Sequence, residues 1–468
     1  MMKVKRPGTQ SCLTSSEVNF INETESRSMA APGPSLRLID AIVFIIGIVI
    51  GAGIFRTPSV VAANTPDTFW FLVLWVIGGI ISLLGAFCYS ELSSTFPNAG
   101  GDYNFLKLAF GEKFSFLFAW SRITITQTGS IAILAFIAGD YLSQLLPLGV
   151  FSSAFYAAVI VITLTLINVL GIKFGVGMQK IMILLQFIGI LIIVLAGLFI
   201  ESSVTMEIPG GHPEISRLSG SSISLALIFV LLTFGGWNEA AYITSELKTG
   251  SRNIALGLII SIFIITLIYI LINLAFLNVL GLEGVAASEA AGVDMMRATL
   301  GEKGVVMIGV LVSLSALTSL NTTIFTGART NYAFGKDFET IAFLGKWNSE
   351  KSAPVNSLLL QGFISILLIT FGAFTRNGFE SMVEFTAPVF WFFFLSTGLS
   401  LFVLRRKKPF VTRPFKVPAY PVTPILFVCF CGYMLYSSLS FTGTGSLMGV
   451  ALLLIGWLIS PLFMSSHQ

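Results

Sequence analysis

Twelve long apolar runs, separated by short polar segments, limit what this chain can fold into. They cover residues 38–63, 70–94, 114–145, 153–171, 177–200, 221–245, 253–280, 303–330, 355–374, 383–404, 421–438 and 444–463. Most are long enough to cross the ~30 Å hydrocarbon core of a bilayer as a helix, and none alternates like a barrel strand. Only 11% of the residues are charged, and the mean hydropathy is +0.88. The sequence therefore predicts an all-α polytopic membrane protein with about twelve transmembrane helices in the lipid bilayer.

The distribution of lysine and arginine predicts the orientation of these helices. With the N-terminus inside, the cytoplasmic segments collect most of the 27 basic residues, and the outer loops keep Arg217, Arg297, Lys303 and Arg376. Because basic loops stay in the cytoplasm, both termini are expected on the cytoplasmic side. The expected location of the protein is the cell membrane. Residues 1–36 are polar and lack the apolar segment of a secretory signal, so they are expected to form a disordered cytoplasmic tail. No feature of the chain supports nucleic-acid binding.

Two of the runs carry glycine clusters that predict interrupted helices. The first run has Gly51 and Gly53 near its middle, and the sixth has Gly235 and Gly236. Each glycine costs about 1 kcal/mol in a helix interior, so a cluster is a weak point in the helix. Gly47 and Gly51 also fit a GxxxG packing pattern, which is an alternative explanation of the first cluster. Matched interruptions in two halves of a chain indicate the binding site of a transporter.

The spacing of the runs predicts an internal repeat within one transporter domain, residues 37–463. Residues 38–200 and 221–404 form two blocks of five runs, and residues 421–463 add two helices. Since each block has an odd number of spans, the second enters the membrane from the opposite side. An inverted repeat with its site at the centre is expected.

The chemistry of two broken helices suits a zwitterion. A helix that begins again near Gly53 directs unpaired N–H groups and a partial positive charge at the gap, where a carboxylate can bind. A helix that stops near Gly235 leaves free carbonyl oxygens, which suit an ammonium group. Together these groups would recognise the backbone of an α-amino acid.

At these residues the chain resembles the amino acid–polyamine–organocation (APC) superfamily, and within it the L-type amino acid transporter branch. The matching stretches are IIGIVIGAGIFRTP (45–58), CYSELSSTFPNAGGDY (88–103), FGGWNEAAYITSELKTGSRNIALG (234–257) and LRRKKPFVTRPFKVPAYP (404–421). The resemblance implies the five-plus-five inverted-repeat fold of LeuT-like transporters, with helices 1 and 6 broken. It also implies secondary active transport of L-amino acids by alternating access, as an exchanger or permease.

The resemblance also implies a set of substrate-binding positions. The carboxylate-binding backbone falls on Gly51, Ala52 and Gly53, and the ammonium-binding carbonyls fall on Val49, Leu232 and Gly235. Thr126, Ser130 and Asn238 are expected to line the same cavity, with Phe390 facing them. Many relatives carry an aromatic residue at the position of Leu232, so this chain departs from a single-ring outer gate. Neutral amino acids are the expected substrates, with cationic amino acids or polyamines as the alternative.

Ionisable residues inside the spans are candidates for gating or proton coupling. Arg56 would either pair with an outer acid such as Asp140, forming an external gate, or serve structure alone. Glu239 would be either a proton site or the partner of a base on the cytoplasmic side. Glu91 is expected to make an inner-gate or structural contact.

The coupling ion is left open between sodium, protons and none. Many family members place a lysine in span five where LeuT-like relatives bind sodium, and Gln186 falls at this position here. Thr318 and Ser319 in span eight resemble hydroxyls that ligate sodium together with a carbonyl of the first span. Ion-coupled symport is therefore the alternative to exchange.

Other functions and partners have less support in the sequence. No nucleophile–base pair, metal cluster or phosphate-binding loop is found in the spans, so neither an enzyme nor a nucleotide-driven pump is expected. A passive channel or a nutrient receptor with this fold stays possible. The loop 146–153 lacks the cysteine by which related light chains bind a heavy chain. A disulfide-linked heavy chain is therefore not expected.

Overall fold

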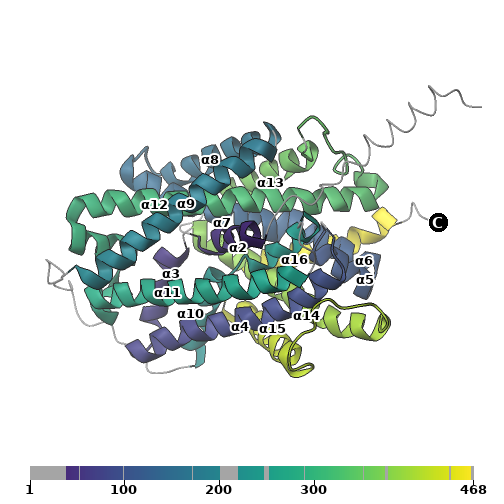
Figure 1. The fold of residues 1–468 in the computed structure, drawn as a ribbon. Helices are drawn as coiled ribbons and strands as arrows, with labels where there is room; N and C mark the ends of the chain where they lie inside the picture. The colour runs from purple at the N-terminus through teal and green to yellow at the C-terminus, as the bar shows by residue number, and fades with distance from the viewer. Residues whose placement is uncertain are drawn as a thin grey trace, which may run out of the picture.

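Long helices that lie side by side make up almost the whole computed structural model (Figure 1). It describes residues 38–51, 53–98, 100–170, 172–200, 220–246, 252–288, 290–351, 353–374, 378–441 and 444–464. The predicted N-terminal tail lies outside these residues. Within them, the extended pairing is limited to an isolated bridge between Asn348 and Ala353. The prediction of an all-α membrane protein is confirmed.

The helices follow the predicted apolar runs. Their bounds are α2 Leu38–Val49, α3 Gly53–Ala63, α4 Thr68–Thr95, α5 Asp102–Phe110, α6 Glu112–Ser121, η1 Arg122–Thr126, α7 Gln127–Leu145, α8 Ser152–Leu170, α9 Ile172–Phe199, α10 Gly220–Thr233, η2 Trp237–Glu246, α11 Arg252–Ala287, α12 Ala291–Asp337, η3 Glu339–Ile341, α13 Val355–Ala373, α14 Gly378–Lys407, α15 Val422–Phe441 and α16 Thr444–Met464. Here η1 is a π-helical turn, and η2 and η3 are 3-10 helices.

Eleven helices of the described residues are long and apolar enough to cross a membrane. The first predicted run is not among them, because it is divided into α2 and α3, of 12 and 11 residues. Together with this divided run, the described residues therefore hold about the twelve spans that the sequence predicts. The inverted relation between 38–200 and 221–404 remains a prediction.

α2, the first half of the first broken span, lies near the centre of the bundle (Figure 1), and the second broken span packs against the first through α10 with α3 and η2 with α2. α2 packs against α11, α12 and α9, while α3 packs against α11 and α10. α6, η1 and α7 form one long span whose turn widens to a π-helix at Arg122–Thr126. A π-turn often marks a functional site, since the extra residue redirects side chains.

A buried carboxylate holds one end of the bundle together. Glu91, near the end of α4, is 1% exposed and accepts hydrogen bonds from Arg405 Nε (2.7 Å) and from the backbone N–H of Val417 (2.7 Å). Arg413 Nε lies 3.3 Å from the same carboxylate. The segment between α14 and α15 is thereby attached to α4. We call this end of the bundle, where α4 and α14 end, the terminal side, because α16 also ends there.

Glu91→Gln should destabilise the protein strongly, because it leaves two arginines beside a neutral group. Removing one partner of a buried ion pair costs about 3–5 kcal/mol, and thermal unfolding in detergent would show the loss. Glu302→Gln is the matched control, since Glu302 is 83% exposed and pairs with Arg297 at the surface. Equal shifts in melting temperature for both variants would contradict this assignment.

Candidate functional site

The first break leaves three carbonyl groups at the end of α2, and each receives a hydrogen bond from a different helix. The pairs are Ser319 Oγ to Ile48 O (3.0 Å), the Tyr269 hydroxyl to Val49 O (2.8 Å) and Gln186 Nε2 to Ile50 O. A polar group buried without a partner costs free energy, so these side chains are what allows α2 to end inside the bundle. α3 then begins at Gly53, as the sequence predicts.

The second break lies directly against the first. α10 ends at Thr233 and η2 begins at Trp237, with Gly236 between them at φ +108°, a conformation that favours glycine. The Tyr269 hydroxyl lies 2.8 Å from Thr233 O as well as from Val49 O, so one side chain joins the two breaks. The hydroxyls of Thr233 and Thr57 are 2.9 Å apart.

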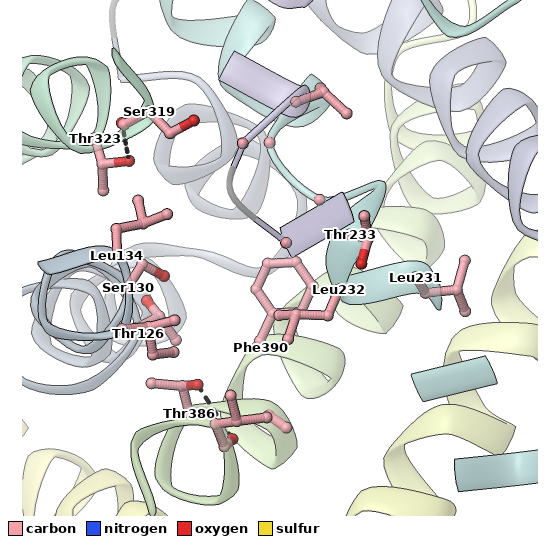
Figure 2. Close-up of a pocket in the computed structure, with 18 of the residues that line it drawn as sticks. Thr126, Ser130, Leu134, Leu231, Leu232, Thr233, Ser319, Thr323, Thr386 and Phe390 are labelled. Atoms are coloured by element: carbon pink, nitrogen blue, oxygen red, sulfur yellow. Dashed lines mark hydrogen bonds between the residues drawn. The ribbon is translucent and has the colours of Figure 1, made fainter. Parts of the chain in front are cut away.

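A cavity of about 190 Å³ adjoins both breaks. The predicted substrate-binding positions that line it are Val49, Gly51, Gly53, Thr126, Ser130, Leu232, Gly235 and Asn238, and Phe390 lines it too. Figure 2 shows Thr126, Ser130 and Leu134 on one wall, with Phe390 and Leu232 facing them. Ala52 lies outside the described residues. The binding roles of these positions remain predictions.

Further lining residues come from periodic faces that the sequence analysis did not identify. Ile133, Leu134 and Ile137 continue the face of Thr126 and Ser130 along α7, and Ile228 and Leu231 face the cavity from α10. The 3–4 residue spacing from Thr126 would have indicated the α7 wall. These apolar residues extend the cavity toward the side opposite the terminal side.

An ion pair closes the end of the cavity that faces the terminal side. Arg122 Nη2 lies 2.9 Å from both carboxylate oxygens of Glu239, and their side chains are only 6% and 11% exposed. Glu239 therefore pairs with a base, Arg122, on the terminal side of the breaks. This agrees with the second of the two predicted roles of Glu239, that of partner to a base. Among the described lining residues, Arg122 and Glu239 are the charged ones.

Arg56 lies away from the cavity, near the opposite end of the bundle. It pairs with Asp140 at 3.1 Å, which confirms the predicted contact, and the two side chains are 35% and 36% exposed. Ion pairs this accessible contribute roughly 0–1 kcal/mol, so a gating role would rest on position rather than strength.

The three residues proposed for a cation site have hydrogen-bonding roles within the protein. Thr318 Oγ1 donates to Leu314 O at 2.7 Å, within its own helix. Ser319 and Gln186 donate to carbonyls of the first break, as described above. Ser319 also borders the substrate cavity. The described residues include no cluster of three His, Cys, Asp or Glu that could hold a metal.

Comparison with known proteins identifies the family. The chain is 29% identical to the b(0,+)-type amino acid transporter 1 of Homo sapiens over 399 residues, which cover 84% of this chain and 80% of that protein. It is 27% identical to the large neutral amino acids transporter small subunit 2 of Mus musculus over 430 residues, covering 90% and 79%. A family model described as amino acid permease matches residues 36–462. This match covers nearly the whole chain, so the protein belongs to the amino acid permease family of membrane transporters.

Proposed function

We propose that this permease exchanges neutral L-amino acids across the membrane by alternating access. The observation that carries the proposal is that two broken helices face one cavity whose charged residues neutralise each other. The cell membrane, with both termini in the cytoplasm, is the proposed location, and the distribution of lysine and arginine supports it.

The substrate backbone would bind between the two breaks. The first-turn N–H groups of α3, from Gly53 onward, have no acceptor within the helix and suit a carboxylate. For the ammonium group, the carbonyl of Gly235 is the best candidate, because the described residues donate no hydrogen bond to it. Leu232 O accepts one hydrogen bond, from the N–H of Gly235, and can accept a second. Val49 O already accepts two, from the N–H of Gly51 and from the Tyr269 hydroxyl, so it would receive an ammonium group only when Tyr269 turns away.

The walls of the cavity favour a neutral side chain. Ile133, Leu134, Ile228 and Leu231 supply apolar surface, and Arg122 is compensated by Glu239. A cationic substrate would need an unpaired carboxylate in the cavity, and the described lining residues offer none. The relative named a large neutral amino acids transporter agrees with this choice.

Exchange without a coupling ion is supported by Gln186. Its side-chain amide donates a hydrogen bond to Ile50 O, the carbonyl at the end of α2. A neutral group therefore satisfies this carbonyl, and no bound sodium ion is needed there. Sodium-coupled symport through Ser319 and proton-coupled symport through Glu239 are the alternatives that the transport experiment must separate.

Purified protein in liposomes should take up labelled neutral amino acids only when unlabelled amino acid is present inside. Exchange predicts this requirement because the carrier returns across the membrane only when loaded. The measurement crosses internal substrate with sodium and proton gradients. Uptake into empty vesicles driven by either gradient would contradict exchange and indicate symport.

Gly53→Val should reduce uptake at least about 100-fold while the protein remains folded, because its side chain narrows the gap between the breaks. A Cβ at Gly53 would lie 3.5 Å from Thr233, an ordinary contact, so the fold tolerates it. Gly432→Val in α15 is the matched control, since a Cβ there meets nothing within 4 Å. Wild-type substrate affinity in the Gly53 variant would exclude the proposed carboxylate site.

We also propose that no heavy chain is disulfide-linked to this protein, although one relative is named a small subunit. The loop 146–151 has no cysteine. Among the described cysteines, Cys88 and Cys431 are buried, and the exposed Cys429 lies within the apolar helix α15 rather than in a loop. On a non-reducing gel, protein from native membranes should therefore run at the mass of the single chain. A band that shifts to this mass only after reduction would refute the proposal.

A further inference from the structure

The Arg122–Glu239 ion pair lies between two cavities. The substrate cavity is on one side, and a smaller cavity of about 30 Å³ lies on the other, toward the terminal side. Arg122, Thr126, Asn238 and Phe390 line both. A substrate leaving toward the terminal side along this line would have to pass the ion pair.

Both partners are held by backbone that is not regular α-helix. Arg122 opens the π-turn η1, and Glu239 lies in the 3-10 helix η2, directly after the second break. Such segments are often places where a helix changes conformation. The pair therefore joins the span of α6 and α7 to the half of the sixth span that would move in alternating access.

The smaller cavity contains a second acid. Asp102, at the start of α5, is 3% exposed and accepts hydrogen bonds from the Tyr242 hydroxyl (3.0 Å) and Thr397 Oγ1 (3.3 Å). The guanidinium of Arg122 lies 4.3 Å from the centre of the Tyr242 ring, a cation–π contact. Burial raises the pKa of Asp102 to about 6, although the Tyr89 hydroxyl, the charge of Arg122 and the Tyr242 hydroxyl each lower this pKa.

Arg122 is incompletely satisfied by Glu239 alone. Its Nε is buried and has no hydrogen-bond partner among the described residues, whereas Nη2 makes both contacts with Glu239. A guanidinium has five N–H donors in a fixed fork. Arg122 can therefore begin to bind a second carboxylate through its remaining donors before it releases Glu239.

We propose that the Arg122–Glu239 ion pair is the terminal-side gate of the substrate cavity, and that Arg122 turns to Asp102 when the gate opens. The closed form is the one described here. In the open form, Glu239 moves away together with η2. The Arg122 side chain then turns across the face of the Tyr242 ring to pair with Asp102, and the two cavities join into one passage. This inference relies on the proposed function only for the movement of substrate through the passage.

Labelling of a cysteine in the smaller cavity tests the gate without any transported substrate. Thr397→Cys places a thiol there, and a membrane-impermeant maleimide is applied to each face of the membrane separately. Peptide mass spectrometry quantifies labelling at residue 397, so the other cysteines do not contribute. Labelling of Cys12 in the same sample identifies the face that carries the N-terminus.

Adding Glu239→Gln should raise terminal-face labelling at least about tenfold, equivalent to about 1.4 kcal/mol of lost closure. The double variant Arg122→Gln with Glu239→Gln should give the same rise and leaves no unpaired charge, so it decides the outcome if the single variant fails to fold. Asp102→Asn should have the opposite effect and lower labelling about threefold, because the open form loses its charged acceptor.

Arg297→Gln is the matched control, because it breaks the pairs of a half-exposed arginine with Asp294 and Glu302 away from both cavities. It should leave terminal-face labelling unchanged. Unchanged labelling in both Glu239 variants, an equal rise in the Arg297 variant, or a rise with Asp102→Asn would overturn the proposal. A rise as expected in a protein that fails to exchange neutral amino acids would instead reject the proposed substrate and leave the gate in place.

Discussion

The central constraint on this structure is that two helices end inside the bundle, where water cannot satisfy their backbone groups. In a membrane core, irregular backbone is tolerated only where protein or a polar cavity surrounds it. Ser319, Tyr269 and Gln186 meet this requirement at the end of α2, and each belongs to a different helix. The breaks are thus a product of α9, α11 and α12 as much as of the glycines. Packing of α2 against these helices places the cavity at the centre.

The surroundings of the breaks divide the site by chemistry. On the side opposite the terminal side, the walls are apolar, formed by residues such as Ile133 and Leu231. On the terminal side, Arg122, Glu239 and Asp102 lie close together under heavy burial. Desolvation of charges so deeply buried costs several kcal/mol each, and attraction to a paired charge is needed to offset this cost. Their presence at one end of the substrate cavity is explained by a function in which pairs form and separate.

Much of this arrangement could be predicted from the sequence. The apolar runs are long enough to define each helix. Gly236 marks the second break, because its positive φ and the close approach of Ile48 favour a residue without a Cβ. Tyr269 could not be predicted, since one tyrosine in an apolar run has no local pattern that distinguishes it from a packed aromatic. The pairing of Arg122 with Glu239 could not be predicted either, because 117 residues separate the two partners in the sequence. Asp102 belongs to a short helix outside the apolar runs, and only the fold brings it beneath the cavity.

The position of Tyr269 has a consequence for how a ligand is received. A phenol has a single proton, yet its oxygen lies 2.8 Å from both Val49 O and Thr233 O. At any moment the hydroxyl can therefore serve only one of these carbonyls. When it serves Thr233 O, Val49 O keeps the backbone N–H of Gly51 as a donor. The two breaks thus compete for one proton, and a ligand that donates to Val49 O, as proposed above, would leave that proton to Thr233 O.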